Sequence, residues 1–333
     1  MGVALRDVLA EYKTPVAWEN LHGVAAIDAH NALYQFLSII RQPDGTPLMD
    51  ERGRVTSHLS GILFRILNFI EKGIKPVFVF DGEPPSFKKA TIEVRREQRE
   101  RASVQWQEAL ERGDKEEAYR QARSASRIDH FVIESSQDLL RLMGIPWVQA
   151  PSEGEAQAAY MVQRGDAHYT VSQDYDTLLF GTPVLVRNLT VSGKRKVRGR
   201  TLSISPERIL LKEIMGGLGI TREELIQVAI LVGTDFNPGI HGIGAKTALK
   251  HVRQGQFTAS LSKHEPGFDL PATINFFLSP PVTDTYALSW GNPDQEGIRR
   301  MLCDGYNFSL ERVNTALEKL GVSFGQKTLD HWF

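Results

Sequence analysis

The feature that most constrains the fold of this chain is a series of short apolar segments that each lead into a carboxylate. Residues 24–27, 75–80, 145–150 and 167–172 read as buried strands, and helix-like segments separate them. Strands that are apolar throughout and alternate with helices are typical of a parallel sheet covered on both faces. The sequence therefore predicts an α/β fold with a mostly parallel central sheet and helices on both faces.

The acidic residues after these segments share one position relative to the predicted sheet. In an open parallel sheet the carboxyl ends of the strands form one rim, so side chains that follow the strands should lie close together. A further aspartate follows an apolar helical run in the segment VGTDFNPG. The candidate set is Asp28, Asp81, Glu153, Glu155, Asp174, Asp176 and Asp235.

Each of these acids also has an ordinary structural interpretation. Asp28 could cap the helix that follows it, Asp81 could begin a turn with Gly82, and Glu153 could lie in the first turn of a helix. Caps do not require the doublets ExE and DxD, however. The doublet Asp174 and Asp176 interrupts an otherwise strand-like run. Several ionised carboxylates close together repel one another unless a cation lies between them.

The composition of the chain narrows the choice of cation. The single cysteine, Cys303, excludes an intramolecular disulfide and a zinc knuckle, and the nine histidines are scattered. Oxygen ligands suit magnesium or manganese, and seven carboxylates are more than one ion requires. Two ions about 4 Å apart can generate an attacking hydroxide and stabilise the leaving oxygen in phosphodiester hydrolysis. The sequence predicts such a two-metal site.

Other segments fit a nucleic-acid partner. Residues 239–250 read GIHGIGAKTALK, and glycines before a helix let backbone amides hold a phosphate, although they could simply end a helix. We expect a helix-hairpin-helix DNA-binding element over 233–250. Residues 187–200 contain six basic residues and no acid, which fits a phosphate-tracking hairpin or a nuclear address.

The rest of the chain is predicted to contain an inserted segment and a mainly helical second half. Residues 83–127 are rich in charge and in helix formers, and they predict an inserted, largely exposed helical pair that protrudes from the domain. After residue 200 the chain reads as mainly helical, and residues 267–297 read as loop-rich. With 333 residues, the chain is long enough for one large domain.

Several blocks give a specific resemblance. They read, in chain order, MGV, AIDAHNALYQFL, TSHLSGILFR, FVFDGEPPSFKK, APSEGEAQAAYM, SQDYDTLLFG, VGTDFNPGIHGIGAKTAL and QKTLDHWF. Over nearly the whole chain the sequence resembles the archaeal-type flap endonucleases. This resemblance implies a structure-specific 5′ nuclease, with 5′-3′ exonuclease activity, that removes 5′ flaps in lagging-strand maturation and base-excision repair.

The resemblance also implies roles for individual residues. One metal ion would be held by Asp28, Asp81, Glu153 and Glu155, and the other by Asp174, Asp176 and Asp235, or some of these acids would be shared between the two ions. Lys88 and Arg95 would act at the scissile phosphate, Tyr34 would stack on the terminal base pair, and residues 83–127 would form the arch that the 5′ end passes through. The helix-hairpin-helix is associated in this family with a potassium ion. The DNA-contacting set is Gly2, Tyr34, Lys88, Arg95, Glu153, Gly233, Asp235, Gly242, Gly244 and Lys246.

On this interpretation one nuclease domain spans residues 1–325, followed by a sliding-clamp motif at 326–333. Within the domain we expect an N-terminal region at 1–98 and an internal nuclease region at 128–255. The residues whose spacing matches the clamp-binding motif are Gln326, Leu329, Trp332 and Phe333. The alternative is an amphipathic turn packed on the protein's own core. Gly321 and Gly325 favour a flexible lead into the motif.

Two further expectations concern source and location. No apolar stretch approaches the length of a membrane span and no signal segment begins the chain, so we expect a monomeric cytoplasmic protein at the nucleoid. Relatives from eukaryotes have a basic residue in place of Glu83 and a basic tail beyond the position of Phe333, which favours an archaeal source.

The rival functions are a PIN-like ribonuclease or another 5′ exonuclease, and a non-catalytic protein that binds DNA or a clamp. Cleavage of a double-flap DNA rather than single-stranded RNA would distinguish the nucleases. The complete acidic set argues against the non-catalytic alternative, because an inactive scaffold does not need a rim of costly charges.

Overall fold

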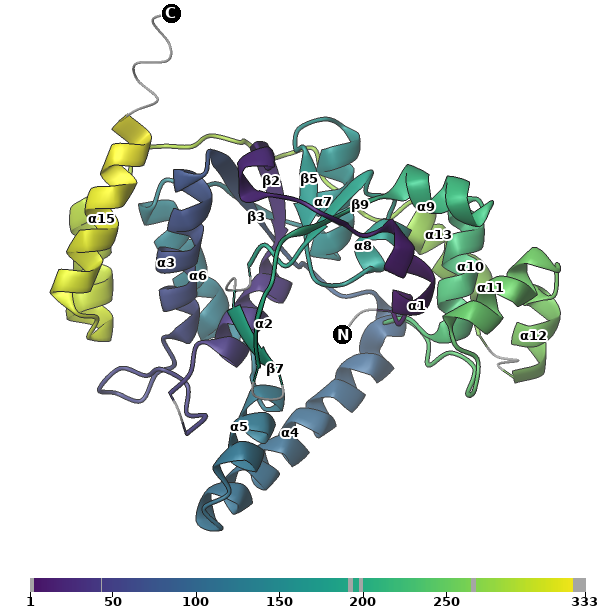
Figure 1. Cartoon of the computed structure of the whole chain (residues 1–333), viewed down its shortest axis with the longest axis horizontal. Helices are drawn as coiled ribbons and strands as arrows, with labels where there is room; N and C mark the ends of the chain where they lie inside the picture. Colours follow the sequence, from purple (N-terminus) through teal and green to yellow (C-terminus); the bar gives the residue numbers. More distant parts are fainter. Residues whose placement is uncertain (1–2, 43, 191–193, 198–199, 265–267, 326–333) are drawn as a thin grey trace, which may run out of the picture.

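A seven-stranded sheet forms the centre of the computed structural model, which describes residues 3–42, 44–190, 194–197, 200–264 and 268–325 (Figure 1). The strand order is β1-β9-β6-β5-β2-β3-β4. Five neighbouring strands are parallel: β6 (Val184–Arg187), β5 (Tyr169–Val171), β2 (Gly23–Asp28), β3 (Ile74–Phe80) and β4 (Trp147–Gln149). Two antiparallel strands complete one edge, β9 (Glu207–Leu210) and β1 (Thr14–Pro15). The predicted mostly parallel sheet is confirmed.

Side chains of alternating residues on β3 pack on opposite faces of the sheet, as the two-residue repeat of a strand requires. Phe78 and Phe80 belong to a core beneath one group of helices, whereas Val77 and Val79 belong to another core. The first group of helices is α2 (Ala29–Ile39), α3 (Ser57–Glu71), α6 (His130–Leu142) and α15 (Leu310–Gly325). The opposite face is covered by α7 (Gly154–Gln163). Both faces are therefore buried.

A third hydrophobic core lies among the helices beyond β5 and β9. Its aromatic centre includes Phe87, Phe236 and Phe276, whose rings lie edge to face with centroids 5.1–5.3 Å apart. The helices are α1 (Arg6–Leu9), α8 (Asp176–Leu179), α9 (Leu211–Leu218), α10 (Arg222–Val232), α11 (Ala245–Arg253), α12 (Phe257–His264) and α13 (Leu270–Leu278). Phe87 precedes Lys88 and Phe236 follows Asp235, so this packing fixes two site residues at once.

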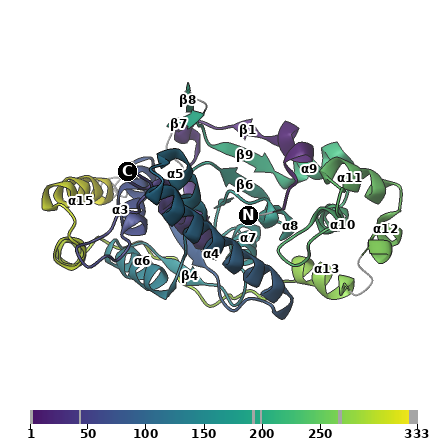
Figure 2. The ribbon, with the colours of Figure 1, turned by 90° about the horizontal axis from the view of Figure 1, so that it is seen from below.

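The insertion predicted for residues 83–127 is a pair of helices. After a 3₁₀ turn at Ser86–Lys88, α4 (Lys89–Glu111) and α5 (Lys115–Ser124) pack against each other and project from the domain (Figure 1). Viewed from below, the pair lies across the middle of the molecule (Figure 2). The residues buried along these two helices are all alanines: Ala102, Ala109, Ala118 and Ala122. Because alanine buries little area, this pair has a thin apolar seam.

Some sequence-based expectations were wrong. The segment after Asp174 is not a strand: Asp176 begins α8, because a short apolar run buried all round suits a helical turn as well as a strand. Residues 200–210 form β8 (Arg200–Ser203), paired with β7 (Lys194–Val197), and then β9. The chain at 267–297 contains α13 before an irregular stretch that ends at α14 (Gln295–Arg299).

The expected flexible lead into the C-terminal motif was also wrong, because Gly321 and Gly325 both lie in α15. A π-helical turn at Arg300–Asp304 and 3₁₀ turns at Ala10–Tyr12 and Trp18–Asn20 complete the elements. Among the helices that the structure describes, none combines the length and the apolar character needed to cross a membrane.

His58 is a buried histidine that gives the fold a measurable dependence on pH. Its Nε2 lies 2.8 Å from Ser135 Oγ, which itself donates to Phe131 O, so His58 Nε2–H is the donor. Nδ1 has no partner among the described residues, and burial lowers the pKa of His58 to about 3. The ring is therefore neutral when the protein is folded.

We predict that the free energy of unfolding falls as the pH drops below about 6.5, because the unfolded histidine takes up a proton that the folded one cannot hold. The slope from this residue is at most about 1.4 kcal/mol per pH unit. Denaturant unfolding of the parent and of His58→Phe between pH 7 and pH 5 measures it. The variant should lose less stability over this range, and equal losses would contradict the assignment.

Candidate active site

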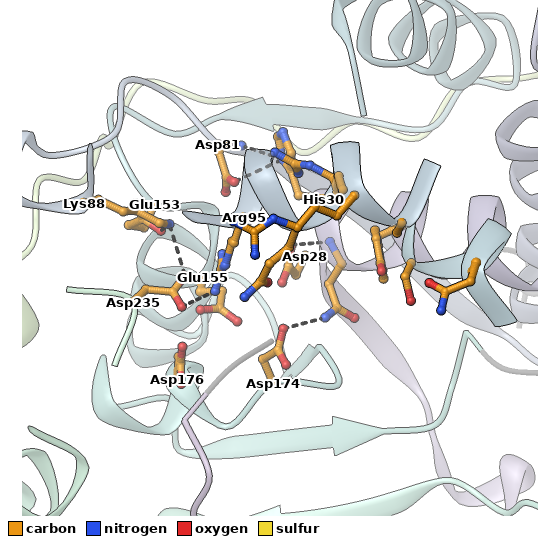
Figure 3. A pocket seen from close by; sticks show the side chains of 18 of the residues that line it. Asp28, His30, Asp81, Lys88, Arg95, Glu153, Glu155, Asp174, Asp176 and Asp235 are labelled. Carbon is orange, nitrogen blue, oxygen red and sulfur yellow. Dashed lines mark hydrogen bonds and ion pairs between the residues drawn. The ribbon is translucent and has the colours of Figure 1, made fainter. Parts of the chain in front are cut away.

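One cavity of about 570 Å³ lies between the carboxyl ends of the parallel strands and α4, and Figure 3 shows side chains that line it. The structure brings all seven predicted carboxylates to its lining, together with the basic residues Lys88 and Arg95. Tyr34 also lines it, is 41% exposed, and places its hydroxyl 3.5 Å from the carbonyl oxygen of Arg123 at the end of α5. The rim predicted from the sequence is thus a real cluster in space.

Asp28 serves two purposes with its two oxygens. It ends β2 and caps α2, because Oδ1 accepts a hydrogen bond from the backbone N–H of Asn31 at 3.0 Å. Its Oδ2 accepts from Ser172 Oγ at 3.1 Å. The cap interpretation is therefore correct for Asp28, and the same side chain also faces the cavity.

The start of α7 brings three more acids together. Glu153 precedes the helix and Glu155 lies in its first turn. Asp81, which follows β3, accepts a hydrogen bond from Gly154 N at 2.8 Å. A Cβ atom on residue 154 would lie only 2.7 Å from Asp81 Oδ1, so the close approach of helix and strand requires glycine here.

The other acids come from loops that follow β5 and α10. Asp174 lies in the bend after β5, and Asp176, the first residue of α8, accepts from Val3 N at 2.7 Å. Asp235 lies in the loop between α10 and α11. The residues that we expected to contact DNA in this loop and the following turn, Gly233, Gly242, Gly244 and Lys246, do not line the cavity.

Burial and mutual repulsion raise the pKa values of several of these carboxyl groups. Burial, followed by the charge of Asp81, raises the pKa of Asp28 to about 8. Burial, followed by Asp235 and Asp174, raises the pKa of Asp176 to about 7. The pKa of Glu155 is raised well above its usual value by burial and by Asp176. A cation placed among them would reverse these shifts.

Two basic side chains from the base of α4 pair with the acids. Lys88 Nζ lies 2.5 Å from Glu153 Oε2 and 3.5 Å from Asp235 Oδ2, and Arg95 is hydrogen-bonded to Asp235 Oδ1. Burial lowers the pKa of Lys88, but the nearby charges of Glu153, Asp235 and Asp81 outweigh burial and raise it. Burial raises the pKa of Glu153, against the opposing effect of the Lys88 charge.

As the side chains stand, no three histidine, cysteine or acidic residues in the described part of the chain form a complete metal shell. The chemistry of the candidate donors nevertheless fits a hard divalent cation: they are all carboxylate oxygens, buried or half-buried and mutually repelling. Lys88 and Arg95 supply positive charge to Glu153 and Asp235 in this arrangement.

Sequence reasoning missed several polar residues at the site, among them His30, Asn31 and Ser172. His30 Nδ1 lies 3.3 Å from both the backbone nitrogen and Oδ2 of Asp81. Asn31 Nδ2 donates to Asp174 Oδ2 at 2.9 Å, and Ser172 Oγ lies within 3.1 Å of both Asp28 Oδ2 and Asp174 N. Their positions beside the acids in DAHN and VSQD were the only available signal. Gly2 and the clamp motif at 326–333 lie outside the described residues.

Sequence and structure comparisons define the class of the protein. The family model of the XPG N-terminal domain matches residues 1–102, and that of the XPG I-region matches residues 144–235. The chain also shares its fold with the catalytic core of Rad2 in complex with DNA substrate, at 24% identity and a TM-score of 0.71 over 95% of this chain and 99% of that one. The fold and the matched regions are those of the XPG-type nucleases.

The chain is a member of the flap endonuclease family and is a structure-specific flap nuclease. It is 66% identical to Flap endonuclease 1 of Methanoregula boonei over the full length of both chains. It is 54% identical to that of Pyrococcus abyssi, over 100% of this chain and 98% of the relative. The solved flap endonuclease-1 of Methanococcus jannaschii matches with a TM-score of 0.78 and 41% identity, over 96% of this chain and 99% of that one.

The raised pKa of Asp28 predicts that the site destabilises the metal-free protein at alkaline pH. An acid whose folded pKa is about 8 adds stability below its unfolded pKa of about 4, and that stability is lost as the pH rises towards 8. We expect Asp28→Asn, which keeps the cap acceptor, to raise the melting temperature at pH 8.5 in a chelator by about 2 °C or more.

Asp50→Asn is the matched control for this prediction. Asp50 is also buried, but hydrogen bonds from Arg54 and Arg52 outweigh burial and lower its pKa. This variant should therefore lower the melting temperature under the same conditions. Melting followed by circular dichroism in the chelator compares the two, and destabilisation by Asp28→Asn would show that the rim is not repulsive.

Proposed function

We propose that this flap nuclease, which also acts as a 5′-3′ exonuclease, hydrolyses DNA phosphodiesters with two magnesium ions, for which manganese can substitute. We infer that it acts at the archaeal nucleoid in Okazaki-fragment maturation and repair. The observation that carries the proposal is the convergence of seven carboxylates on one cavity beside two basic side chains from the arch. Lys88 and Glu153 form an ion pair that joins the arch to the rim of the sheet.

The division of the carboxylates between the two ions follows the resemblance to the flap endonucleases. We assign Asp28, Asp81, Glu153 and Glu155 to one ion, and Asp174, Asp176 and Asp235 to the other. Two bound ions would activate the attacking water and neutralise charge on the phosphate and the leaving oxygen. The protein's own part is to hold these oxygens in a cavity where burial makes each ionised carboxylate depend on a cation.

Lys88 and Arg95 fit a role at the scissile phosphate. Both belong to the base of the arch and both already contact carboxylates of the rim. We infer that a substrate phosphate takes the place of these carboxylate partners when ions bind to the acids. Its negative charge then meets a lysine and an arginine that need no large movement to reach it.

DNA contacts away from the chemistry fit backbone recognition. Tyr34 is exposed at the cavity and can stack on a terminal base pair, while the single strand passes through the arch of α4 and α5. The loop between α10 and α11 presents Gly242 and Gly244 at the surface, and Lys246 is exposed in the first turn of α11. We assign this helix–loop–helix unit, with Gly233 at the start of its loop, to duplex phosphates and a potassium ion.

The test of the proposed function is cleavage of a labelled double-flap DNA with and without a divalent ion. We expect magnesium-dependent release of the 5′ flap and no cleavage in a chelator. A single-stranded RNA of the same length serves as the rival substrate. Faster cleavage of the RNA than of the flap would favour a PIN-like ribonuclease, and cleavage in the chelator would exclude the metal mechanism.

The assignment of Lys88 and Arg95 makes a separate prediction. If their charges act on the phosphate as it reacts, Lys88→Ala or Arg95→Ala should lower the single-turnover rate by about 100-fold or more, with flap affinity changed only a few-fold. Arg96→Ala is the control, since Arg96 lies on the same helix but is exposed and pairs with Glu93 and Glu100. Equal losses of rate and affinity would mark Lys88 and Arg95 as ordinary phosphate contacts.

The clamp motif makes the last of these predictions. We propose that Gln326, Leu329, Trp332 and Phe333 bind the sliding clamp, since large aromatic side chains of this spacing are typical anchors for a partner's pocket. Deleting residues 326–333 should leave clamp-free cleavage and the melting temperature unchanged while abolishing stimulation by the cognate clamp. A marked fall in melting temperature, with stimulation retained, would instead place these aromatics in the protein's own core.

A further inference from the structure

Asn31, in the first turn of α2, contacts one acid from each proposed metal group. Its backbone N–H donates to Asp28 Oδ1 at 3.0 Å, and its side-chain Nδ2 donates to Asp174 Oδ2 at 2.9 Å. The second bond is the dashed line that reaches Asp174 in Figure 3. Asp28 ends β2 and Asp174 follows β5, and Asn31 and Asp174 are 143 positions apart in the chain. Asn31 therefore connects an acid of one proposed metal group to an acid of the other.

The orientation of the Asn31 amide is fixed by a donor that cannot change its role. The backbone N–H of Gln173 donates to Asn31 Oδ1 at 3.1 Å, and a backbone N–H can only donate. The oxygen of Asn31 must therefore face Gln173, and its NH₂ group must face Asp174. The amide presents a donor to the carboxylate and would hold Asp174 Oδ2 in one place.

A chain of buried groups supports this orientation from behind. Gln35, one helical turn along α2, donates from Nε2 to Asn31 Oδ1 at 2.5 Å. Its Oε1 accepts from the hydroxyl of Thr190 at 2.7 Å. Gln35 is 9% exposed and Thr190 is 4% exposed, so neither can readily exchange its partner for water. Each of these contacts joins a donor to an acceptor, and reversing Asn31 would break three bonds at once.

The peptide that carries Asp174 is held on its other side as well. Arg187 Nε donates to the carbonyl oxygen of Gln173 at 3.1 Å, and the guanidinium group lies 4.2 Å from the ring centroid of Tyr175. Both the N–H and the C=O of Gln173 are thus bonded to side chains from other elements. The loop before Asp174 has little freedom, so the bond from Asn31 acts on a carboxylate whose backbone is already fixed.

We propose that Asn31 is a positioning residue that sets the spacing between the two metal groups, through its bonds to Asp28 and Asp174. The inference rests on the proposed roles of Asp28 and Asp174 as metal ligands. Groups that orient the ligands of a metal typically change its affinity or the activity by about 10- to 100-fold when they are removed. Asn31 itself need not touch either ion or the DNA.

Two substitutions separate this role from simple filling of space. Asn31→Asp keeps the shape and the oxygen that accepts from Gln173 and Gln35, but it replaces the N–H donor with an oxygen that repels Asp174. Asn31→Ala removes the whole amide. A positioning role predicts that both variants lower the single-turnover rate by about 10-fold or more, whereas space filling predicts that only Asn31→Ala does.

The experiment compares the parent, both variants and Asn68→Ala, a control on an exposed position of α3. Single-turnover cleavage of the flap, flap affinity in a chelator and melting temperature are measured on the same preparations. Binding of manganese to the DNA-free protein, followed by electron paramagnetic resonance, gives a readout that does not depend on activity. We expect weaker manganese binding and slower cleavage for both Asn31 variants, with flap affinity within about threefold of the parent.

Asn31→Asp with the parent's rate and manganese affinity would overturn the proposal, as would a fall in flap affinity that accounts for the whole loss of rate. If Asn31→Ala fails to fold, the isosteric Asn31→Asp still decides the question. A parent that cleaves without a divalent ion would refute the proposed function itself. An active, metal-dependent parent with unaffected variants would refute only the role of Asn31.

Discussion

Burial of like charges at the carboxyl rim of the sheet is the constraint on which the rest of this structure depends. Asp28, Glu155 and Asp176 lie where burial and their acidic neighbours raise the pKa of each. A protein selected for stability alone has no reason to keep such a cluster, because each ionised carboxylate costs free energy without a compensating cation. The cost is understandable if the rim exists to hold divalent ions against DNA.

The arch is tied to this rim by both charge and packing. Lys88 and Arg95 pair with Glu153 and Asp235, and the rings next to two of these residues, Phe87 and Phe236, pack 5.2 Å apart. The aromatic contact fixes the base of α4, whereas the thin alanine seam between α4 and α5 leaves the rest of the arch with little apolar area of its own. The part of the arch nearest the chemistry is therefore its most firmly held part.

The sequence predicted the sheet and the rim because strand ends obey a geometric rule that needs no tertiary information. The structural interpretation of Asp28 is confirmed, since one oxygen caps α2, and the same side chain also lines the cavity and accepts from Ser172 with its other oxygen. The hydrogen bond from Asn31 to Asp174 could not have been predicted, because the two residues are far apart along the chain. β9 was missed for a similar reason: it is a strand only because β6 and β1 pair with it.

The most direct test of the central claim is to measure flap cleavage and flap affinity for Asp174→Ala on one preparation, in magnesium and in a chelator. If the rim holds the catalytic ions, turnover should fall by at least about 1,000-fold, because a lost ligand removes several kcal/mol of transition-state stabilisation. Affinity should stay within about threefold, since it comes mainly from remote backbone contacts. Turnover within about tenfold of the parent, at unchanged affinity, would contradict the account.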